Sequence, residues 1–324
     1  MTPSRIPLLL VLLLVAGCGG GGSGSAASQS FVLTVNDDNW NEIWVMDESG
    51  KDRKQLTKSK PIESEAAGNT SPTWSPDRHR IAYTGTGDAV LQDPTFEEIY
   101  AMDPDGSHVD QLTKNNVPDF SPDWSDDGKR FVFSRGEGLL TEAPTASLYT
   151  MDADGSDQKE LYRGKGALLV TPDWSPDGKR VAFTRVAYPA NSGVPIPSVW
   201  VINSDGSGAH KIADHASDPA WAPDGQHIAI ATGRDRFGKT CFGGCSPNDE
   251  IYVVDPNGAD PKRLTKDEAE DSAPTWSPDG TQIAFVSDRA NRESANDIFI
   301  VDATGGEAKP ITANDVWDLE PDWK

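Results

Sequence analysis

The sequence predicts an all-β protein, a six-bladed β-propeller, from three observations: a long internal repeat, short apolar strands within it, and tight turns between them. Successive repeat tryptophans lie 50, 50, 47, 55 and 47 residues apart. A period of this length is typical of propeller arrays, so we interpret each repeat as one blade. The repeat is marked by proline, any residue, then tryptophan, at Pro72–Trp74, Pro122–Trp124, Pro172–Trp174, Pro219–Trp221, Pro274–Trp276 and Pro321–Trp323.

Each period holds the same elements in the same order. The tryptophan ends an innermost strand, and a turn such as Ser175–Gly178 follows, in which proline presets φ and glycine suits the fourth position. A second strand, a variable loop, a third strand and a second turn such as Asp152–Gly155 come next. The third strands are apolar on both faces, as in Ile298–Val301, which indicates burial between sheets. A short outer strand completes four antiparallel strands per blade.

The two ends of the chain are expected to share one blade. The last period stops at Trp323 and Lys324, after its innermost strand, whereas the strands predicted within residues 31–57 lack an innermost partner. The C-terminal strand would complete this N-terminal blade, so that five whole blades and one composite blade form a ring of six. Closure removes the free sheet edges that would otherwise pair with other chains.

Residues 1–17 are predicted to be a lipoprotein signal peptide. Arg5 precedes an apolar run at residues 6–15 that is shorter than the about 20 residues a membrane-spanning helix needs. The following Val-Ala-Gly-Cys resembles a bacterial lipobox, in which Cys18 is lipidated, and a secretory signal with an incidental cysteine is the alternative. Residues 18–30 would form a flexible Gly/Ser linker and residues 31–324 the propeller. We therefore expect an extracytoplasmic protein, lipid-anchored in the periplasm or at the cell surface.

The charge of the chain limits the classes of partner, and its cysteines indicate a disulfide. The formal net charge of −22 argues against nucleic acid and against adsorption to anionic lipid, and it allows basic protein partners or bound cations. Solubility alone is the alternative reading of this charge. Cys241 and Cys245 are expected to form a disulfide in an oxidising compartment, because a zinc site would need two further ligands nearby.

The repeat resembles that of the TolB-type (PD40, WD40-like) family. Phe285–Arg289 followed by Asn296–Asp302 carries the resemblance, as do the Trp-Ser-Pro-Asp-Gly segments such as residues 174–178. The resemblance covers residues 31–324 and implies the propeller fold without assigning a function. The chain lacks the α/β domain that precedes the propeller in TolB. It also lacks the Gly-x-Ser-x-Gly motif of the hydrolase domain that accompanies related propellers in prolyl oligopeptidases.

Candidate binding residues lie in the loops of one rim. The loops between second and third strands are longer than a turn requires, so specificity is expected there, with unconstrained drift as the alternative. Two tryptophans occupy no repeat position, and exposed aromatic residues can anchor partners. The rim candidates are Trp40, His215, Arg234, Arg236, Phe237 and Trp317.

A second candidate site is a polar ring at the mouth of the channel. Three residues before the blade proline stand Asn69, Asp119, Asp271 and Asp318. Repeat geometry points them towards the channel mouth, where carboxylates would attract a cation, and their oxygens suit Ca²⁺ or another divalent cation. The alternative is that they cap local turns through their own backbone.

Two functions follow from these patterns. The first is a non-catalytic, lipid-anchored binding or scaffold module, expected to be a monomer, which recognises a protein, a peptide or a cell-wall polymer with its loop rim. The second is a metal-dependent hydrolase or lyase acting on saccharide or peptide, with metal held by Asp119, Asp271 and Asp318, and with His215 as a further candidate ligand. The first is favoured because no catalytic acid–base pair can be named.

Overall fold

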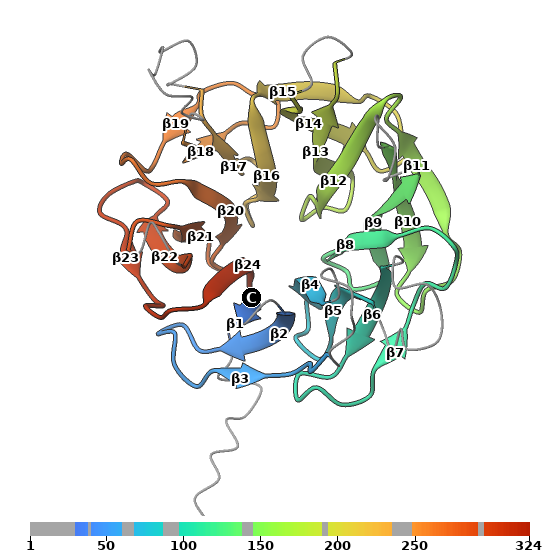
Figure 1. Cartoon of the computed structure of the whole chain (residues 1–324). Coiled ribbons are helices and arrows are strands. Elements are labelled where there is room, and N and C mark those ends of the chain that lie inside the picture. The colour runs from blue at the N-terminus through green and yellow to red at the C-terminus, as the bar shows by residue number, and fades with distance from the viewer. Residues whose placement is uncertain are drawn as a thin grey trace, which may run out of the picture.

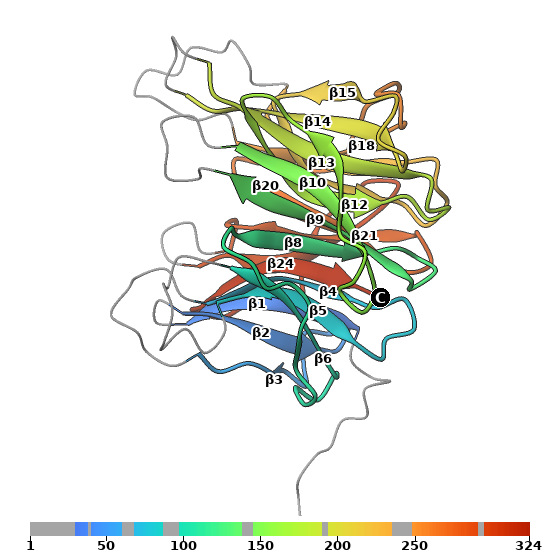
Figure 2. The ribbon, with the colours of Figure 1, turned by 90° about the vertical axis from the view of Figure 1, so that its right-hand side faces the viewer.

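Six four-stranded antiparallel sheets surround a central channel (Figures 1 and 2), which confirms the predicted six-bladed β-propeller. Within the described residues no helix is long and apolar enough to cross a membrane. The predicted signal peptide and all of the predicted linker except Ser30 lie outside the described residues. The computed structural model describes residues 30–37, 40–59, 68–86, 97–137, 145–189, 194–234, 248–290 and 295–324.

Each blade runs outward from the channel through an innermost, a second, a third and an outer strand. Blade A consists of β24 (Trp317–Trp323), β1 (Phe31–Asp37), β2 (Trp40–Met46) and β3 (Lys54–Gln55). Blade B consists of β4 (Asn69–Trp74), β5 (Ile81–Gly85), β6 (Glu98–Met102) and β7 (Asp110–Gln111). Blade C consists of β8 (Asp119–Trp124), β9 (Arg130–Glu137), β10 (Thr145–Asp152) and β11 (Lys159–Arg163). Blade D consists of β12 (Ala167–Trp174), β13 (Arg180–Ala187), β14 (Ile196–Asn203) and β15 (His210–Asp214). Blade E consists of β16 (Ala216–Trp221), β17 (Ile228–Thr232), β18 (Glu250–Val254) and β19 (Lys262–Arg263). Blade F consists of β20 (Asp271–Trp276), β21 (Gln282–Ser287), β22 (Asp297–Asp302) and β23 (Lys309–Pro310).

Blade A is the composite blade that the sequence predicts. Strand β24 pairs with β1 so that Phe31 lies opposite Trp323, and their rings stack with centroids 4.7 Å apart. The Lys324 N–H donates to the Ser30 carbonyl at 3.0 Å, and the Ser30 N–H donates to the Met46 carbonyl at 3.0 Å. Ser30 is therefore already part of the propeller.

The hydrophobic core lies between blades, which explains why the second and third strands are apolar on both faces. Between blades E and F, Ile251 and Val253 of one blade pack with Phe285 of the next. Each large apolar side chain buried in this way contributes about 1.5–3 kcal/mol. Arginines reinforce the packing, because the Arg180 guanidinium of blade D lies 4.5 Å from the ring centroid of Trp221 in blade E.

The turn between the third and outer strands docks against the preceding blade. Gly155 has a φ of +85°, and a Cβ at this position would lie 2.4 Å from the carbonyl oxygen of Leu112. Glycine is therefore required both by the left-handed backbone and by the close approach of another backbone. The equivalent Gly50 closes the ring, since a Cβ there would lie 1.8 Å from the carbonyl oxygen of Ile311.

Replacing Gly155 with alanine is expected to lower the free energy of unfolding by about 2–4 kcal/mol, from the left-handed strain and the clash together. Urea denaturation would measure the change. Gly128→Ala is the matched control, because Gly128 has a similar φ of +68° and its nearest neighbour would be 3.9 Å from an added Cβ. Equal losses in the two variants would show that inter-blade docking contributes nothing.

Candidate functional site

Every innermost strand contains a β-bulge just before its repeat proline. The residue before each proline has a positive φ of 46–51° although none is glycine. Proline disfavours the right-handed helical conformation in the residue before it, and bulges commonly lie next to functional sites. The six bulge residues are Ser71, Ser121, Thr171, Asp218, Ala273 and Glu320.

Neighbouring blades hold the bulges in place. The Ser71 N–H donates to Oε2 of Glu320 at 2.7 Å, which joins blades B and A. The Asp218 N–H donates to the Thr184 hydroxyl of blade D at 3.0 Å, and the Ser121 N–H donates to the Thr84 hydroxyl of blade B at the same distance. These bonds offset the strain of the left-handed backbone and couple each blade to the next.

The bulges line a cavity of about 380 Å³ in the channel. We call this the loop end, where the innermost strands begin, and the opposite end the turn end, where they finish. All six repeat prolines line the loop-end cavity, together with apolar Val286 and Leu319. The bulge carboxylates Asp218 and Glu320 face the same space. The wall thus combines rigid apolar surface with negative charge, as ligand-binding pockets commonly do.

Further carboxylates increase the negative charge at the loop end. Burial raises the pKa of Glu97, and the charge of Glu320 raises it further. Burial, together with the charges of Glu270 and Asp218, raises the pKa of Asp249 to about 7. Burial also raises the pKa of Asp218. Since like charges raise one another's pKa values here, the loop end attracts positive charge.

Each of the four residues of the predicted polar ring has hydrogen-bond partners within the protein. Asp119, Asp271 and Asp318 have no exposed surface. Each carboxylate binds an arginine, and the distances are 2.6 and 2.7 Å for Asp119 with Arg135. The same distances join Asp271 to Arg289, and Asp318 binds Arg53 at 2.5 and 2.8 Å. The Asn69 amide donates to Glu42 and Ser59, both at 3.1 Å.

These contacts differ from the predicted arrangement, in which the four residues would share a cation. The three aspartates belong to blades C, F and A, and each one is neutralised by its own arginine rather than aimed at a shared ion. Among the described residues, no group of three or more His, Cys, Asp or Glu side chains could hold a metal ion. The metal set expected for a hydrolase or lyase is therefore not assembled there.

The predicted rim residues differ in how exposed they are. Trp317 is 47% exposed at the start of β24, and Trp40 is half-buried at the start of β2. Arg234 is exposed and lies 5.8 Å from the Tyr252 ring centroid, and His215 is half-buried just before β16. Four further predicted residues lie outside the described part of the chain: Arg236, Phe237, Cys241 and Cys245.

A repeated network that sequence reasoning did not anticipate fixes the loop end of four blades. The Thr113 hydroxyl accepts from the Ile99 N–H at 2.9 Å and donates to Glu98 at 2.6 Å. Glu98 also accepts from the Asn115 N–H at 2.7 Å. The sequence carries a sign of this network: in these blades an acidic residue precedes an isoleucine in the third strand, and a threonine follows the outer strand. The corresponding pairs are Thr57 with Glu42, Thr265 with Glu250, and Thr312 with Asp297.

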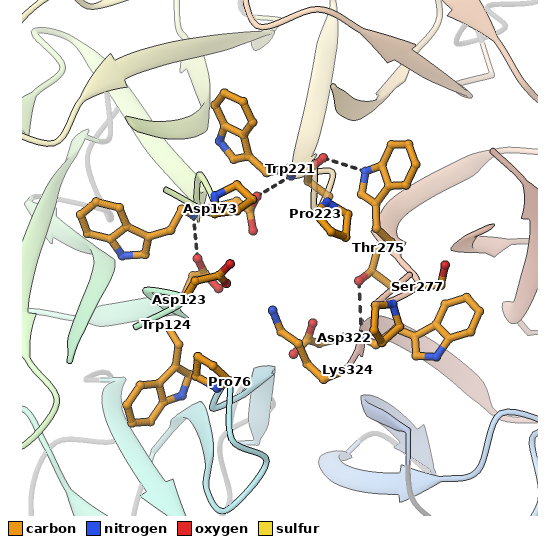
Figure 3. A pocket seen from close by; sticks show the side chains of 17 residues that line it. Pro76, Asp123, Trp124, Asp173, Trp221, Pro223, Thr275, Ser277, Asp322 and Lys324 are labelled. Carbon is orange, nitrogen blue, oxygen red and sulfur yellow. Dashed lines mark hydrogen bonds between the residues drawn. The ribbon is translucent and has the colours of Figure 1, made fainter. Parts of the chain in front are cut away.

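Five of the six middle residues of the Pro-x-Trp motifs, all except Thr73, line the turn end of the channel (Figure 3). Asp123 accepts from the Trp174 N–H at 2.7 Å, and Asp173 accepts from the Trp221 N–H at 2.6 Å. Asp322 likewise accepts from a tryptophan N–H, that of Trp74, at 2.7 Å. Each bond joins one blade to another, so these carboxylates help to hold the ring closed.

Comparisons with known proteins agree with this architecture. The profile of the TolB beta propeller domain matches residues 139–324, and that of the dipeptidyl peptidase IV N-terminal region matches residues 13–137. Dipeptidyl-peptidase 5 of Porphyromonas gingivalis is 26% identical over 250 residues, which cover 66% of this chain and 36% of that protein. A TolB homolog of Chlorobium luteolum is 26% identical over 194 residues, which cover 60% of this chain and 29% of that protein. The chain thus spans about a third of the length of these two relatives.

Among solved structures, TolB from Acinetobacter baumannii superposes with a TM-score of 0.66 at 19% identity. The alignment covers 91% of this chain and 66% of that chain. At this identity the likeness shows a shared fold, and function has to be argued from the site itself.

Proposed function

The chain belongs to the TolB β-propeller family, and from that premise we propose that it is a non-catalytic binding module that holds a basic segment of a protein partner in the loop end of its channel. The observation that carries this proposal is the surplus of carboxylates around an apolar, proline-lined cavity. The predicted signal peptide and lipobox support a location outside the cytoplasm, with lipid anchoring through Cys18 as part of the proposal.

The lining chemistry supports a peptide rather than a substrate undergoing reaction. Six prolines give a rigid apolar surface, which suits the side chains of an extended segment. The pKa values of Glu97 and Asp249 are raised chiefly by burial, and the lining carboxylates Glu320 and Asp218, respectively, raise them further. A bound lysine or arginine would relieve repulsion that the free protein retains. Binding of this kind gains association rate and specificity from charge, and it weakens as salt increases.

The test is capture from a detergent extract of cell envelopes by the immobilised full-length protein. The double variant Glu97→Gln with Asp249→Asn removes two charges, and neither side chain forms a hydrogen bond or ion pair with the side chain of another described residue. We expect a partner retained by the wild type to be weakened about tenfold or more. The matched control is Asp154→Asn with Asp205→Asn, which removes two charges from exposed outer turns.

Two results would contradict the proposal. One is equal retention of every captured protein by the wild type, the double variant and the control at low and high salt. The other is chemical conversion of the captured partner by the propeller, which would reassign the protein as an enzyme.

A further inference from the structure

The turn end of the channel holds a cavity of its own, of about 280 Å³, which is larger than the about 150 Å³ cavity known to admit benzene. Tryptophans and prolines such as Trp124 and Pro223 form rigid walls (Figure 3). The carboxylates of Asp123, Asp173 and Asp322 line the same space. They lie deep in the protein but keep some accessible surface, and the cavity supplies it.

The inter-blade bonds leave carboxylate oxygens available to a ligand. Asp173 binds the Trp221 N–H through Oδ2, and no hydrogen bond to its Oδ1 is made by a described residue. Asp123 binds the Trp174 N–H through Oδ2, and its Oδ1 has only a long contact of 3.5 Å with the Thr73 hydroxyl. Blades C and D therefore present two adjacent, only partly satisfied carboxylates.

Lys324 shares this cavity without pairing directly with the acids. Its side chain points into the channel (Figure 3), and among the described residues its ammonium forms neither a hydrogen bond nor an ion pair. Burial works against its charge, but Asp322, Asp123, Asp126 and Asp173 raise its pKa on balance. One ammonium thus faces four carboxylates across open space.

The pKa values of the acids agree with this excess of negative charge. Burial raises the pKa of Asp123 to about 7 although Lys324 lowers it. Burial and the charge of Asp123 raise the pKa of Asp173 well above its usual range. A further positive group in the cavity would lower the free-energy cost of keeping both Asp123 and Asp173 ionised.

We propose that the turn end of the channel is a binding site for a small organic cation of the guanidinium class, held by Asp123 and Asp173 opposite Lys324. The described carboxylates do not gather closely enough to hold a metal ion, so the bridging cation has to be larger. A guanidinium is planar, spreads its charge and carries five donors in a fixed fork, which suits two carboxylates on adjacent blades. This site is at the turn end of the channel, and it adjoins the loop-end cavity because Asp123, Asp173 and Asp322 line both. It does not use Glu97 or Asp249, so each proposal is tested by its own variants.

Isothermal titration of the full-length protein in detergent with agmatine tests the site. We expect saturable one-to-one binding at pH 7 that weakens about tenfold or more in Asp173→Asn. The asparagine keeps an oxygen acceptor for the Trp221 N–H, so the fold is expected to survive, and a thermal melt checks this. Asp260→Asn, outside the channel, is the matched control and should bind as the wild type does.

Removing the ammonium of Lys324, which competes with the ligand for the carboxylates, should change the affinity for agmatine in the opposite direction. Lys324→Met keeps an unbranched side chain but loses the charge, so agmatine should bind more tightly. Binding at pH 7 should also release protons, which appears as a dependence of the measured heat on the ionisation enthalpy of the buffer. Competition with N-acetyl-arginine amide tells whether the natural ligand is an arginine side chain or a free small cation. The competitor displaces agmatine if the site takes an arginine side chain, and it fails to do so if the site takes only a free small cation.

Three outcomes would overturn the assignment. They are absence of saturable binding with a Kd below about 1 mM, equal binding by the wild type and Asp173→Asn, and loss of binding in Lys324→Met. The last result would show that the Lys324 side chain helps to build the site instead of competing with the cation.

Discussion

Replacing Asp318 with alanine is expected to lower the free energy of unfolding by about 3 kcal/mol. The Asp318 carboxylate has no exposed surface, and it binds Arg53 at 2.5 and 2.8 Å and the Asn314 amide at 2.7 Å. Removing it leaves a guanidinium, only 22% exposed, without its counter-charge. Urea denaturation of the variant beside Glu307→Ala, a control at an exposed position expected to change stability by less than about 0.5 kcal/mol, would measure the effect.

This pair also joins the two ends of the chain, since Arg53 and Asp318 are 265 residues apart in sequence and lie in the same blade. Hydrogen exchange should therefore speed up first at the amides of β24 in Asp318→Ala. In Asp119→Ala, whose partner Arg135 lies on the adjacent strand, exchange should speed up first in blade C instead. Uniform acceleration across all blades in both variants would contradict a local role in ring closure.

The blades could be predicted from sequence because their signals are local. The Pro-x-Trp motif, the Ser-Pro-Asp-Gly turns and the apolar strands each span only a few residues, and the repeat itself supplies the count. The composite blade followed from the same counting, because Trp323 completes an innermost strand that the segment containing Phe31 lacks.

The role of the polar ring could not be found by this counting. The repeat position of Asp119 makes it a candidate, but its partner Arg135 is set by strand register, and the partner of Asp318 is set by ring closure. The sequence does offer a sign of these ion pairs, because arginines recur near the ends of second strands, as in Phe-Ser-Arg ending at Arg135 and Ser-Asp-Arg ending at Arg289. An acid and an arginine recurring at such positions predict an ion pair better than a metal site.

The carboxylates of the turn end cannot be recognised from the Pro-x-Trp motif alone, because its middle residue differs between repeats. Side chains alternate between the two faces of a strand, so the residue before the tryptophan lies on the opposite face of the blade. In the closed ring this position also lines the channel in several blades. Asp123, Asp173 and Asp322 occupy that position, whereas blade E has Ala220 and blade F has Thr275. Only the closed ring shows that the acids share one cavity with Lys324.

The buried acids of the channel also determine how stability depends on pH. The pKa of Asp123 rises from an ordinary value of 3.8 to about 7 in the folded protein, chiefly through burial. Between these two values the folded state binds more protons than the unfolded state, so the free energy of unfolding falls as pH rises from about 4 to 7. Asp249, also raised to about 7, acts in the same direction. Lys324 stays protonated throughout this range and leaves the slope unchanged.

We expect the free energy of unfolding to be higher at pH 5 than at pH 8 by on the order of 2 kcal/mol. Below pH 4 it should fall again, because turn carboxylates such as Asp77 have lowered pKa values and lose their hydrogen bonds to Ser75 on protonation. Urea midpoints measured from pH 3 to 8 would trace this curve.

Asp123→Asn provides the decisive comparison for this pH dependence. The amide can still accept from the Trp174 N–H, but it has no charge to bury and no longer repels Asp173. The variant should lose less stability than the wild type between pH 5 and 8, and the slope that remains should come from Asp249 and Asp173. If its slope equalled that of the wild type, Asp123 would not be among the groups that titrate in this range, and other acids of this highly charged chain would be the cause instead.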